Sequence, residues 1–263
     1  MDRKTLLLEA INAALKGGEE ILNVYNSEFA VEHKDDKSPL TEADKRAHIA
    51  ITEHLTFLGL PILSEEGKTM EYAERKDWQQ FWMVDPLDGT KEFVKRNGEF
   101  TVNIALIEDG HSTMGVIYVP VTKDLYFSDE KAYKVEGFNA PITDLDNLIN
   151  SSIQLPAVQN RNNYVVVGSR SHMSEETEAF INEQKEIHQE VDILSKGSSL
   201  KLCMVAEGKA DAYPRFAPTM EWDTAAGQAI VNGSGAQVIN WETQKPMLYN
   251  KENLLNSWFL VRR

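Results

Sequence analysis

Acidic side chains are concentrated in three short segments whose carboxylates could act together. The segments are Ser64-Glu65-Glu66, Asp85-Pro86-Leu87-Asp88-Gly89-Thr90 and Glu221-Trp222-Asp223. Carboxylates that lack nearby bases repel one another, and removing them from water is costly. A divalent cation resolves that conflict, and a set of oxygen ligands suits Mg²⁺, Mn²⁺ or Ca²⁺ better than Zn²⁺. The three segments therefore predict a divalent-cation site.

The middle segment has the features of a rigid metal-binding turn. Pro86 fixes one backbone dihedral angle, so we expect Asp85 and Asp88 to be held in place. The carbonyl of Leu87 lies between them in the chain and could be a further ligand. A helix that begins at Thr90 would offer free N–H groups to a phosphate. Because paired cations activate a water and stabilise the leaving oxygen in phosphoryl transfer, this segment predicts phosphate chemistry.

Other interpretations of this turn are weaker. An Asp-Gly pair on its own is more often structural. Haloacid dehalogenases place a nucleophilic Asp in an Asp-x-Asp-Gly-Thr motif, whereas two residues separate Asp85 from Asp88. An EF-hand needs alternating acids and a closing Glu, and this loop has neither. The six histidines show no zinc-binding spacing, so an oxygen-ligated cation remains the prediction.

Composition and charge limit the class of partner. The chain has 263 residues, 42% hydrophobic and 26% charged, as is typical of a globular protein with one large or two small domains. Lys and Arg number 27 against 41 Asp and Glu, and the net charge of −14 disfavours polymeric nucleic acid and anionic membranes. A small anionic molecule can still bind where cations gather. Cys203 is the only cysteine, so we expect it to pack in the core.

The first part of the chain mixes helices with a run of strands. Apolar residues at three- and four-residue steps from Leu8 to Tyr25 predict a helix, and Thr41-Glu42-Ala43-Asp44 is typical of the capping box of a second. A polar loop is expected between them at 32–39. The polar, turn-rich stretch 137–163 is the best boundary. Short apolar runs before it predict strands at 61–63, 81–84, 100–106, 113–119, 125–128 and 132–135.

Beyond that boundary, strands and helices alternate. The strands are predicted at 164–167, 191–194 and 210–213, and the helices at 175–185, 198–207 and 224–231. Such alternation is typical of an α/β arrangement. We therefore predict an α/β protein in two parts. An α+β half over residues 1–155 carries most metal ligands, and an α/β half over residues 156–263 carries Asp223 and the nucleotide contacts.

The acidic segments also carry a family resemblance. Together with Thr224-Ala225-Ala226-Gly227 they resemble the signature of the inositol monophosphatase superfamily of lithium-sensitive, Mg²⁺-dependent phosphatases. The match spans the chain from Lys34 to Gly227. Within it, 37–44 and 88–93 are similar to the 3′(2′),5′-bisphosphate nucleotidase branch, because inositol monophosphatases more often have Thr-Asn where this chain has Lys91-Glu92.

That resemblance implies a fold and an activity. The fold is a layered αβαβα sandwich. The activity is removal of the 3′-phosphate from adenosine 3′,5′-bisphosphate, a by-product of sulfate activation in sulfur assimilation, to give AMP and phosphate by attack of a metal-activated water. The alternative within the class is an inositol monophosphatase or a related sugar-phosphate phosphatase. A rival from another class is a non-catalytic Ca²⁺- or phosphate-binding module.

The resemblance assigns metal-binding roles to particular residues. Glu65, Asp85 and the carbonyl of Leu87 would hold a first Mg²⁺ ion. Asp85, Asp88 and Asp223 would hold a second ion. The complete site would hold two or three ions. Lithium sensitivity is implied in the same way.

Catalytic and substrate-binding roles follow from the same resemblance. Asp44 and Thr90 would form the catalytic pair that activates the water, although the capping of a helix by itself also explains Asp44. Lys201 and Arg215 would bind a second phosphate, with solvated surface charge as the alternative for both. His172 resembles a nucleotide-contacting residue. The substrate-binding set as a whole is Glu65, Leu87, Asp88, Gly89, Thr90, Ser198, Lys201, Arg215 and Asp223.

The sequence also gives expectations about location and assembly. No apolar run approaches the roughly 18 residues of a transmembrane helix. The stretch 1–9 meets an acid after three leucines, unlike a signal peptide. We therefore expect a cytoplasmic protein, and the resemblance allows peripheral attachment at the inner membrane. The oligomeric state is open, because core packing explains the apolar stripe of the first helix.

Overall fold

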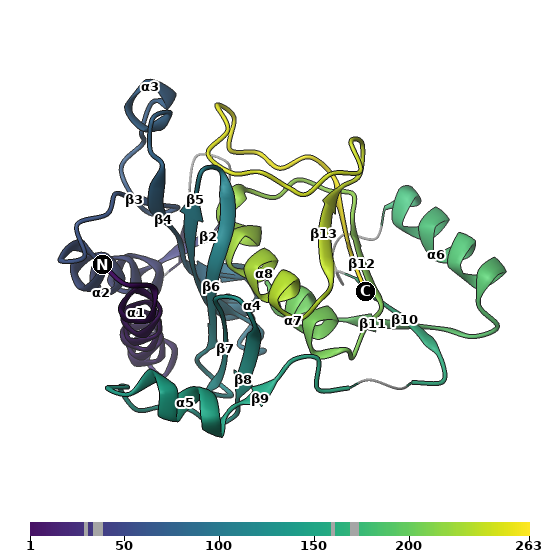
Figure 1. The fold of residues 1–263 in the computed structure, drawn as a ribbon, viewed down its shortest axis with the longest axis horizontal. Helices are drawn as coiled ribbons and strands as arrows, with labels where there is room; N and C mark the ends of the chain where they lie inside the picture. The colour runs from purple at the N-terminus through teal and green to yellow at the C-terminus, as the bar shows by residue number, and fades with distance from the viewer. Residues whose placement is uncertain (29–30, 34–38, 159–160, 169–173) are drawn as a thin grey trace.

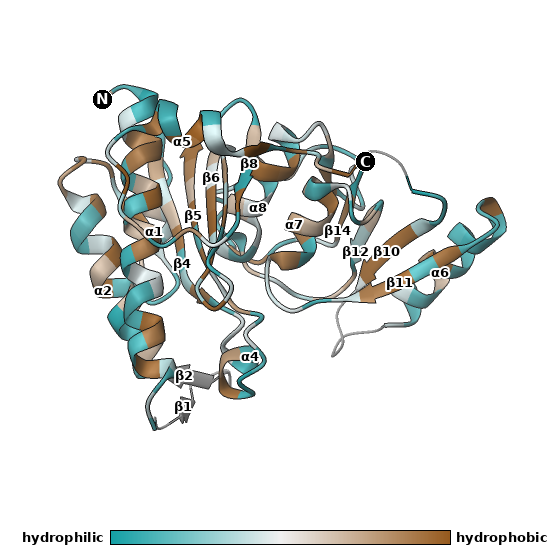
Figure 2. Ribbon diagram, turned by 90° about the horizontal axis from the view of Figure 1, so that it is seen from below, coloured by the Kyte–Doolittle hydropathy of each residue, from teal (hydrophilic) through white to brown (hydrophobic). Residues whose placement is uncertain are grey.

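Helices and sheets alternate in five layers (Figure 1). The computed structural model describes residues 1–28, 31–33, 39–158, 161–168 and 174–263. One face of a seven-stranded sheet is covered by α1 (Arg3–Tyr25) and α2 (Glu42–Thr56), and the other by α7 (Leu200–Glu207) and α8 (Glu221–Gly233). A five-stranded sheet packs on the far side of α7 and α8, and α6 (Glu175–Ile187) lies outside it. The predicted αβαβα sandwich is confirmed, and Figure 2 shows its layers from a second side.

The seven-stranded sheet follows the order of the chain, from β3 to β9. Its first two strands, β3 and β4, are parallel, and each later pair is antiparallel. The bounds are β3 (Ile62–Ser64), β4 (Gln80–Asp88), β5 (Thr101–Glu108), β6 (His111–Val119), β7 (Asp124–Ser128), β8 (Ala132–Val135) and β9 (Ile153–Gln154).

The five-stranded sheet has the order β11-β10-β12-β14-β13. Parallel pairs join β10 to β11 and β12, whereas β14 is antiparallel to β12 and β13. Its strands are β10 (Tyr164–Gly168), β11 (Val191–Ser195), β12 (Ala212–Arg215), β13 (Gln237–Asn240) and β14 (Phe259–Arg262). The remaining elements are the paired strands β1 (Val31–His33) and β2 (Pro39–Thr41) and the short helices α3 (Tyr72–Arg75), α4 (Thr90–Val94) and α5 (Leu145–Ser151).

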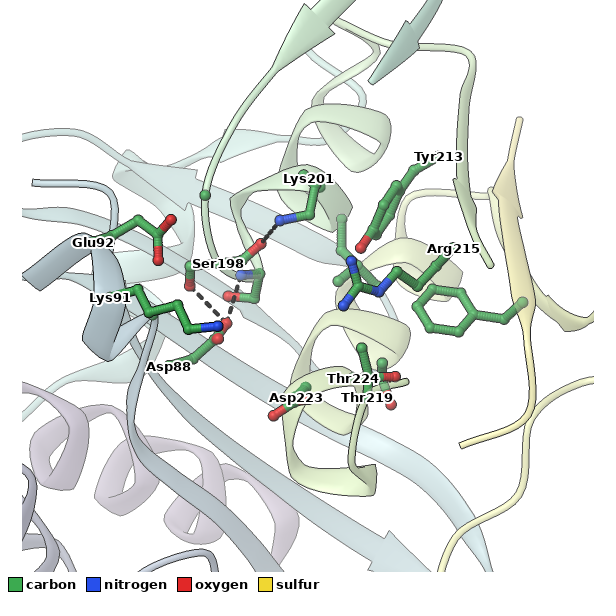
Figure 3. A pocket seen from close by; sticks show the side chains of 15 residues that line it. Asp88, Lys91, Glu92, Ser198, Lys201, Tyr213, Arg215, Thr219, Asp223 and Thr224 are labelled. Carbon is green, nitrogen blue, oxygen red and sulfur yellow. Dashed lines mark hydrogen bonds between the residues drawn. The ribbon is translucent and has the colours of Figure 1, made fainter. Parts of the chain in front are cut away.

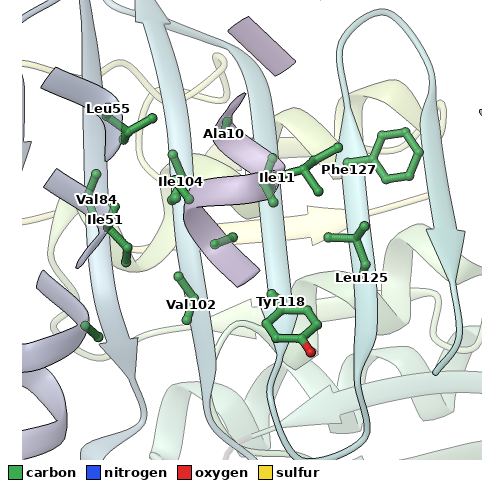
Figure 4. Packing of buried hydrophobic residues seen from close by; sticks show 14 of the residues in the cluster. Ala10, Ile11, Ile51, Leu55, Val84, Val102, Ile104, Tyr118, Leu125 and Phe127 are labelled. Carbon is green, nitrogen blue, oxygen red and sulfur yellow. The ribbon is translucent and has the colours of Figure 1, made fainter. Parts of the chain in front are cut away.

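The central strands of the first sheet are buried on both faces, which explains their continuous apolar sequence. Val102 and Ile104 of β5 face α1 and α2, where they share one hydrophobic cluster with Ile51 (Figure 4). Their neighbours Ala105 and Ile107 belong to a second cluster, formed with residues of α7 and α8. The sheet is therefore held rigidly between two helical layers.

Two local features bring the end of β4 close to the start of α8. The β4–β5 register shifts between Asp85 and Asp88, where Pro86 has no N–H to donate to a regular ladder. On β6, a Cβ added to Gly115 would lie 2.3 Å from the carbonyl oxygen of Ala226. Glycine at this position therefore lets α8 approach the sheet closely.

The observed elements differ from the predicted ones in a few places. β4 continues past Val84 to Asp88, because the strand resumes its pairing with β5 after the register shift. The stretch 137–163 contains α5 and β9, and β13 and β14 were not predicted. The division into halves at 155 and 156 stays a prediction, since α7 and α8 pack between both sheets. Part of the loop predicted at 32–39 lies outside the described residues. Within the described part of the chain, no helix is both long enough and apolar enough to cross a bilayer.

Candidate functional site

Carboxylates from three separate elements meet in one cluster. Glu65 follows β3, Asp85 belongs to β4, and Asp223 lies in the first turn of α8. One carboxylate oxygen from each lies within 4.8 Å of the other two. The parallel pairing of β3 with β4 sets part of this geometry, because the N–H of Glu65 donates to the carbonyl of Val84 at 3.1 Å. Oxygen atoms at these separations can share a divalent cation.

Asp85 is buried and only partly hydrogen-bonded. Its Oδ1 accepts the N–H of Leu87 at 3.1 Å, whereas its Oδ2 is buried and receives no hydrogen bond from the described residues. Burial, followed by the negative charges of Glu65 and Asp88, raises the pKa of Asp85 well above its usual range. A buried carboxylate oxygen without a donor is costly. The carboxylate oxygens of the cluster, including Oδ2 of Asp85, therefore fit a divalent cation.

Asp223 is perturbed for similar reasons. Burial, followed by the negative charge of Asp88, raises the pKa of Asp223 to about 8. Its Oδ2 accepts the N–H of Met220 at 2.8 Å, which caps α8 and fixes the side chain. At neutral pH the cluster must therefore bind protons or a cation, and cation binding would displace the protons.

Asp88 lies beside the cluster and not within it. Its charge raises the pKa of both Asp85 and Asp223, but the three mutually close oxygens come from other residues. One oxygen of Asp88 accepts the hydroxyl of Ser198 at 2.6 Å. A cavity of about 440 Å³ is lined by Asp88 and Leu87 as well as by the cluster. The structure thus brings all five predicted metal ligands to the lining of one cavity, with Asp88 outside the cluster of three carboxylates.

The predicted catalytic pair is in contact. The hydroxyl of Thr90 lies 3.2 Å from Oδ1 of Asp44 and donates to it. The other oxygen of Asp44 accepts the N–H of Thr41 at 2.8 Å and its hydroxyl at 2.6 Å. The bond from the N–H of Thr41 is half of the predicted capping box of α2, and the hydroxyl bond reinforces it. Capping and pairing with Thr90 are therefore not alternatives, because Asp44 uses one oxygen for each.

Gly89 forms the tight connection between β4 and α4. Its φ is +93°, a left-handed conformation that favours glycine. A Cβ at this position would lie 3.2 Å from the carbonyl oxygen of Glu99 and 3.2 Å from Cβ of Ser198. The glycine therefore allows the backbone to turn within a crowded site and leaves the start of α4 facing the cavity that Thr90 lines.

A second recess of about 150 Å³ adjoins this cavity and is lined by three basic side chains, Lys91, Lys201 and Arg215 (Figure 3). Lys201 is buried, its ammonium donates to the carbonyl of Ser198 at 2.6 Å, and it lies over the ring of Tyr213. Burial lowers the pKa of Lys201 to about 8. Arg215 donates to the carbonyl of Pro218 at 3.0 Å, while its Nε is buried without a partner among the described residues. Lys201 is therefore buried and is not a solvated surface charge, whereas Arg215 is half-buried.

Some contributors to the site were missed at the sequence level. Tyr213 lines the recess, and Asn103 lies 3.4 Å from Asp88 through its Nδ2. The sequence does contain a sign of the role of Asn103, because it is a polar residue within the apolar run of β5. A buried strand tolerates a polar side chain only where that side chain has a hydrogen-bond partner. The predicted residue His172 lies outside the described residues.

Comparisons with known proteins agree over nearly the whole chain. The model of the Inositol monophosphatase family matches residues 2–259. The 3′(2′),5′-bisphosphate nucleotidase CysQ of Salmonella typhimurium is 44% identical over 261 residues, which cover 97% of this chain and 99% of the relative. The CysQ protein of Escherichia coli K12 is 43% identical over 262 residues, with the same coverage.

Solved structures show the same relationship. The crystal structure of CysQ from Bacteroides thetaiotaomicron, a bacterial member of the inositol monophosphatase family, superposes with a TM-score of 0.92 at 50% identity. The match covers 99% of this chain and 97% of that one. SuhB from Bartonella henselae shares the fold with a TM-score of 0.74 at 23% identity, over 98% of this chain and 94% of its own. The chain belongs to the inositol monophosphatase family.

Proposed function

We propose that this chain is a Mg²⁺-dependent 3′(2′),5′-bisphosphate nucleotidase. It removes the 3′-phosphate of adenosine 3′,5′-bisphosphate, which arises as a by-product of sulfate activation, and releases AMP and phosphate. The observation that carries the proposal is the clustering of Glu65, Asp85 and Asp223 next to a recess lined by Lys201 and Arg215. The names of the relatives at 43–44% identity support the choice of substrate.

The acidic cavity would hold the cations. Glu65, Asp85, Asp223, the carbonyl of Leu87 and Asp88 supply oxygen ligands only, as Mg²⁺ prefers. We propose two or three Mg²⁺ ions at this site. When bound, they supply Lewis acidity that lowers the pKa of a water and offsets the charge of the phosphate.

Thr90 and Asp44 would orient the water and receive its proton. Because the hydroxyl proton of Thr90 is donated to Asp44, the lone pairs of Thr90 Oγ are free to accept a hydrogen bond from the attacking water. Thr41 fixes the carboxylate of Asp44 from the other side. The N–H groups of Gly89 and Thr90 would bind the oxygens of the scissile phosphate.

Lys201 and Arg215 would bind the second phosphate of the substrate. Apart from these two and Lys91, the side chains that line the recess are acidic or neutral, and the chain carries a net charge of −14, so a second phosphate needs local cations. A phosphate beside Lys201 would favour its protonated form, and the unpaired Nε of Arg215 can donate to a phosphate oxygen. A monophosphorylated sugar would leave these groups unused.

Neutralising Asp223 should abolish turnover and change how stability depends on pH. Burial raises the pKa of Asp223 from 3.8 to about 8, so its stabilising contribution to the metal-free protein is lost as the pH rises through that range. Asp223→Asn should therefore flatten the fall in the thermal midpoint between pH 5 and about pH 8. Turnover at saturating Mg²⁺ should fall on the order of 1,000-fold.

The control for that experiment is Asp77→Asn, which removes one negative charge at an exposed position. Its melting curves should keep the wild-type dependence on pH. An Asp223→Asn variant with near-wild-type turnover, or with the wild-type pH profile of metal-free stability, would contradict the assignment of Asp223.

Removing the hydroxyl of Thr90 should slow catalysis without weakening substrate binding. Thr90→Ala leaves the capping bonds of Asp44 to Thr41 in place, so the protein should fold normally. We expect kcat to fall roughly 100- to 10,000-fold with little change in KM, because the hydroxyl acts on the water. Thr90→Ser keeps the hydroxyl and should retain most activity in steady-state assays. A kcat for Thr90→Ala within a few-fold of wild type would rule out this role.

The choice of substrate is tested by comparing kcat/KM for adenosine 3′,5′-bisphosphate and inositol 1-phosphate. We expect the bisphosphate to be strongly preferred. Lys201→Met and Arg215→Gln should each lower kcat/KM for the bisphosphate about 10- to 100-fold, because each removes a charge-assisted bond, and should affect inositol 1-phosphate much less. Lys95→Gln, an exposed change outside the recess, is the matched control. Preference for inositol 1-phosphate would favour a sugar-phosphate phosphatase, and no phosphate release from either would favour a binding module.

A further inference from the structure

The carboxylate of Asp88 is held by the loop that precedes α7. Its Oδ2 accepts the hydroxyl of Ser198 at 2.6 Å and the N–H of Ser199 at 2.6 Å. Asn103 adds a weaker contact through its Nδ2 at 3.4 Å. Figure 3 shows Ser198 directed at Asp88 across the recess. One oxygen of a predicted metal ligand is therefore saturated by donors from the protein.

These donors come from a distant part of the fold. Asp88 ends β4 in the seven-stranded sheet, whereas Ser198 and Ser199 are more than 100 residues further along and begin the middle helical layer. Ser199 is the N-cap of α7, where the aligned peptide dipoles favour a negative charge. The N-terminus of α7 thus already has the carboxylate of Asp88 as its anion.

The loop is fixed in a conformation that serves this contact. Ser198 has a φ of +54°, a left-handed conformation that is unfavourable for a residue with a Cβ. Glu99 accepts the N–H of Gly197 at 2.9 Å, which holds the loop from one side. The hydroxyl of Thr101 lies 2.7 Å from that of Ser198 and holds it from the other. A glycine would relieve the backbone strain at 198, but it would remove the hydroxyl that reaches Asp88.

We propose that Ser198 is a positioning residue for Asp88. Together with the N–H of Ser199, it binds one oxygen of the carboxylate and leaves the other for the divalent cation. The inference rests on the proposed function for the identity of the metal site. It gives the hydroxyl of Ser198 a role toward the metal ligand, in addition to the substrate-binding role that the family resemblance implies. Hydrogen bonds of this kind orient metal ligands and limit their motion.

Ser198→Gly separates the positioning role from a merely structural one. Glycine tolerates a φ of +54°, so the thermal midpoint of the metal-free variant should match or exceed that of wild type. Its dissociation constant for Mg²⁺, measured by titration calorimetry without substrate, should nevertheless rise about tenfold. If Ser198 only maintained the conformation of the loop, the dissociation constant for Mg²⁺ would not change in this variant.

Two further variants complete the test. Ser198→Ala removes the same hydroxyl without relieving the strain, so it should weaken Mg²⁺ binding equally and melt at a lower temperature than Ser198→Gly. Ser128→Ala is the control, because it removes a buried hydroxyl that donates to the carbonyl of Ala229 at 3.1 Å and has no contact with Asp88 among the described residues. It should lower the thermal midpoint without changing the affinity for Mg²⁺.

The result that would overturn the inference is an unchanged Mg²⁺ dissociation constant in both Ser198 variants, with a raised KM for substrate. That result would place the hydroxyl on the substrate. Failure of the proposed function looks different, because wild type would then bind Mg²⁺ and respond to Ser198→Gly while releasing no phosphate from the bisphosphate.

Discussion

Electrostatic repulsion among buried carboxylates is the constraint on which this structure depends. Glu65, Asp85 and Asp223 place oxygens within 4.8 Å of one another, and Asp88 adds its charge from the side. Burial and these neighbouring charges raise the pKa of Asp85 and of Asp223, so the folded chain does not neutralise the charge by itself. The surrounding layers must therefore be rigid enough to hold the groups together until protons or cations bind.

Rigidity comes from packing on both sides of the cluster. The first sheet is buried against α1 and α2 on one face and against α7 and α8 on the other. The register shift in β4 and the close approach of α8 at Gly115 then bring the acidic segments to one place. The second part of the chain supplies Asp223, Lys201, Arg215 and the two serine donors to Asp88. The site thus forms only when both sheets are packed on the middle helices.

Cations placed beside the carboxylates explain how one acidic protein can bind an anionic substrate. Glu65 and Asp85 line only the acidic cavity and Lys201 lines only the recess, whereas Asp88, Asp223 and Arg215 line both. Ser198 touches both regions, because its hydroxyl donates to Asp88 and its carbonyl accepts the ammonium of Lys201. Its side chain thus contacts the metal side of the site, and its backbone contacts the phosphate side.

Sequence reasoning located what depends on local pattern. The three acidic segments, the capping box at Thr41 and the strands of the first sheet follow from residue type and spacing, and the layered architecture followed from the family resemblance. What it missed depends on long-range contacts. The partners of Asp88 lie on β5 and before α7, and the continuation of β4 to Asp88 depends on pairing with β5. No periodicity in the chain encodes such pairings, although a lone asparagine in an apolar strand is a usable signal.

Anomalous diffraction at the manganese edge, recorded from a crystal soaked in Mn²⁺, would show whether the acidic cavity binds divalent cations. We expect at least two anomalous peaks in the acidic cavity, with oxygens of Glu65, Asp85 and Asp223 at about 2.0–2.3 Å from manganese. Asp88 should contact manganese through the oxygen that Ser198 does not bind. A cavity without manganese at millimolar concentration, or manganese bound elsewhere, would contradict the account.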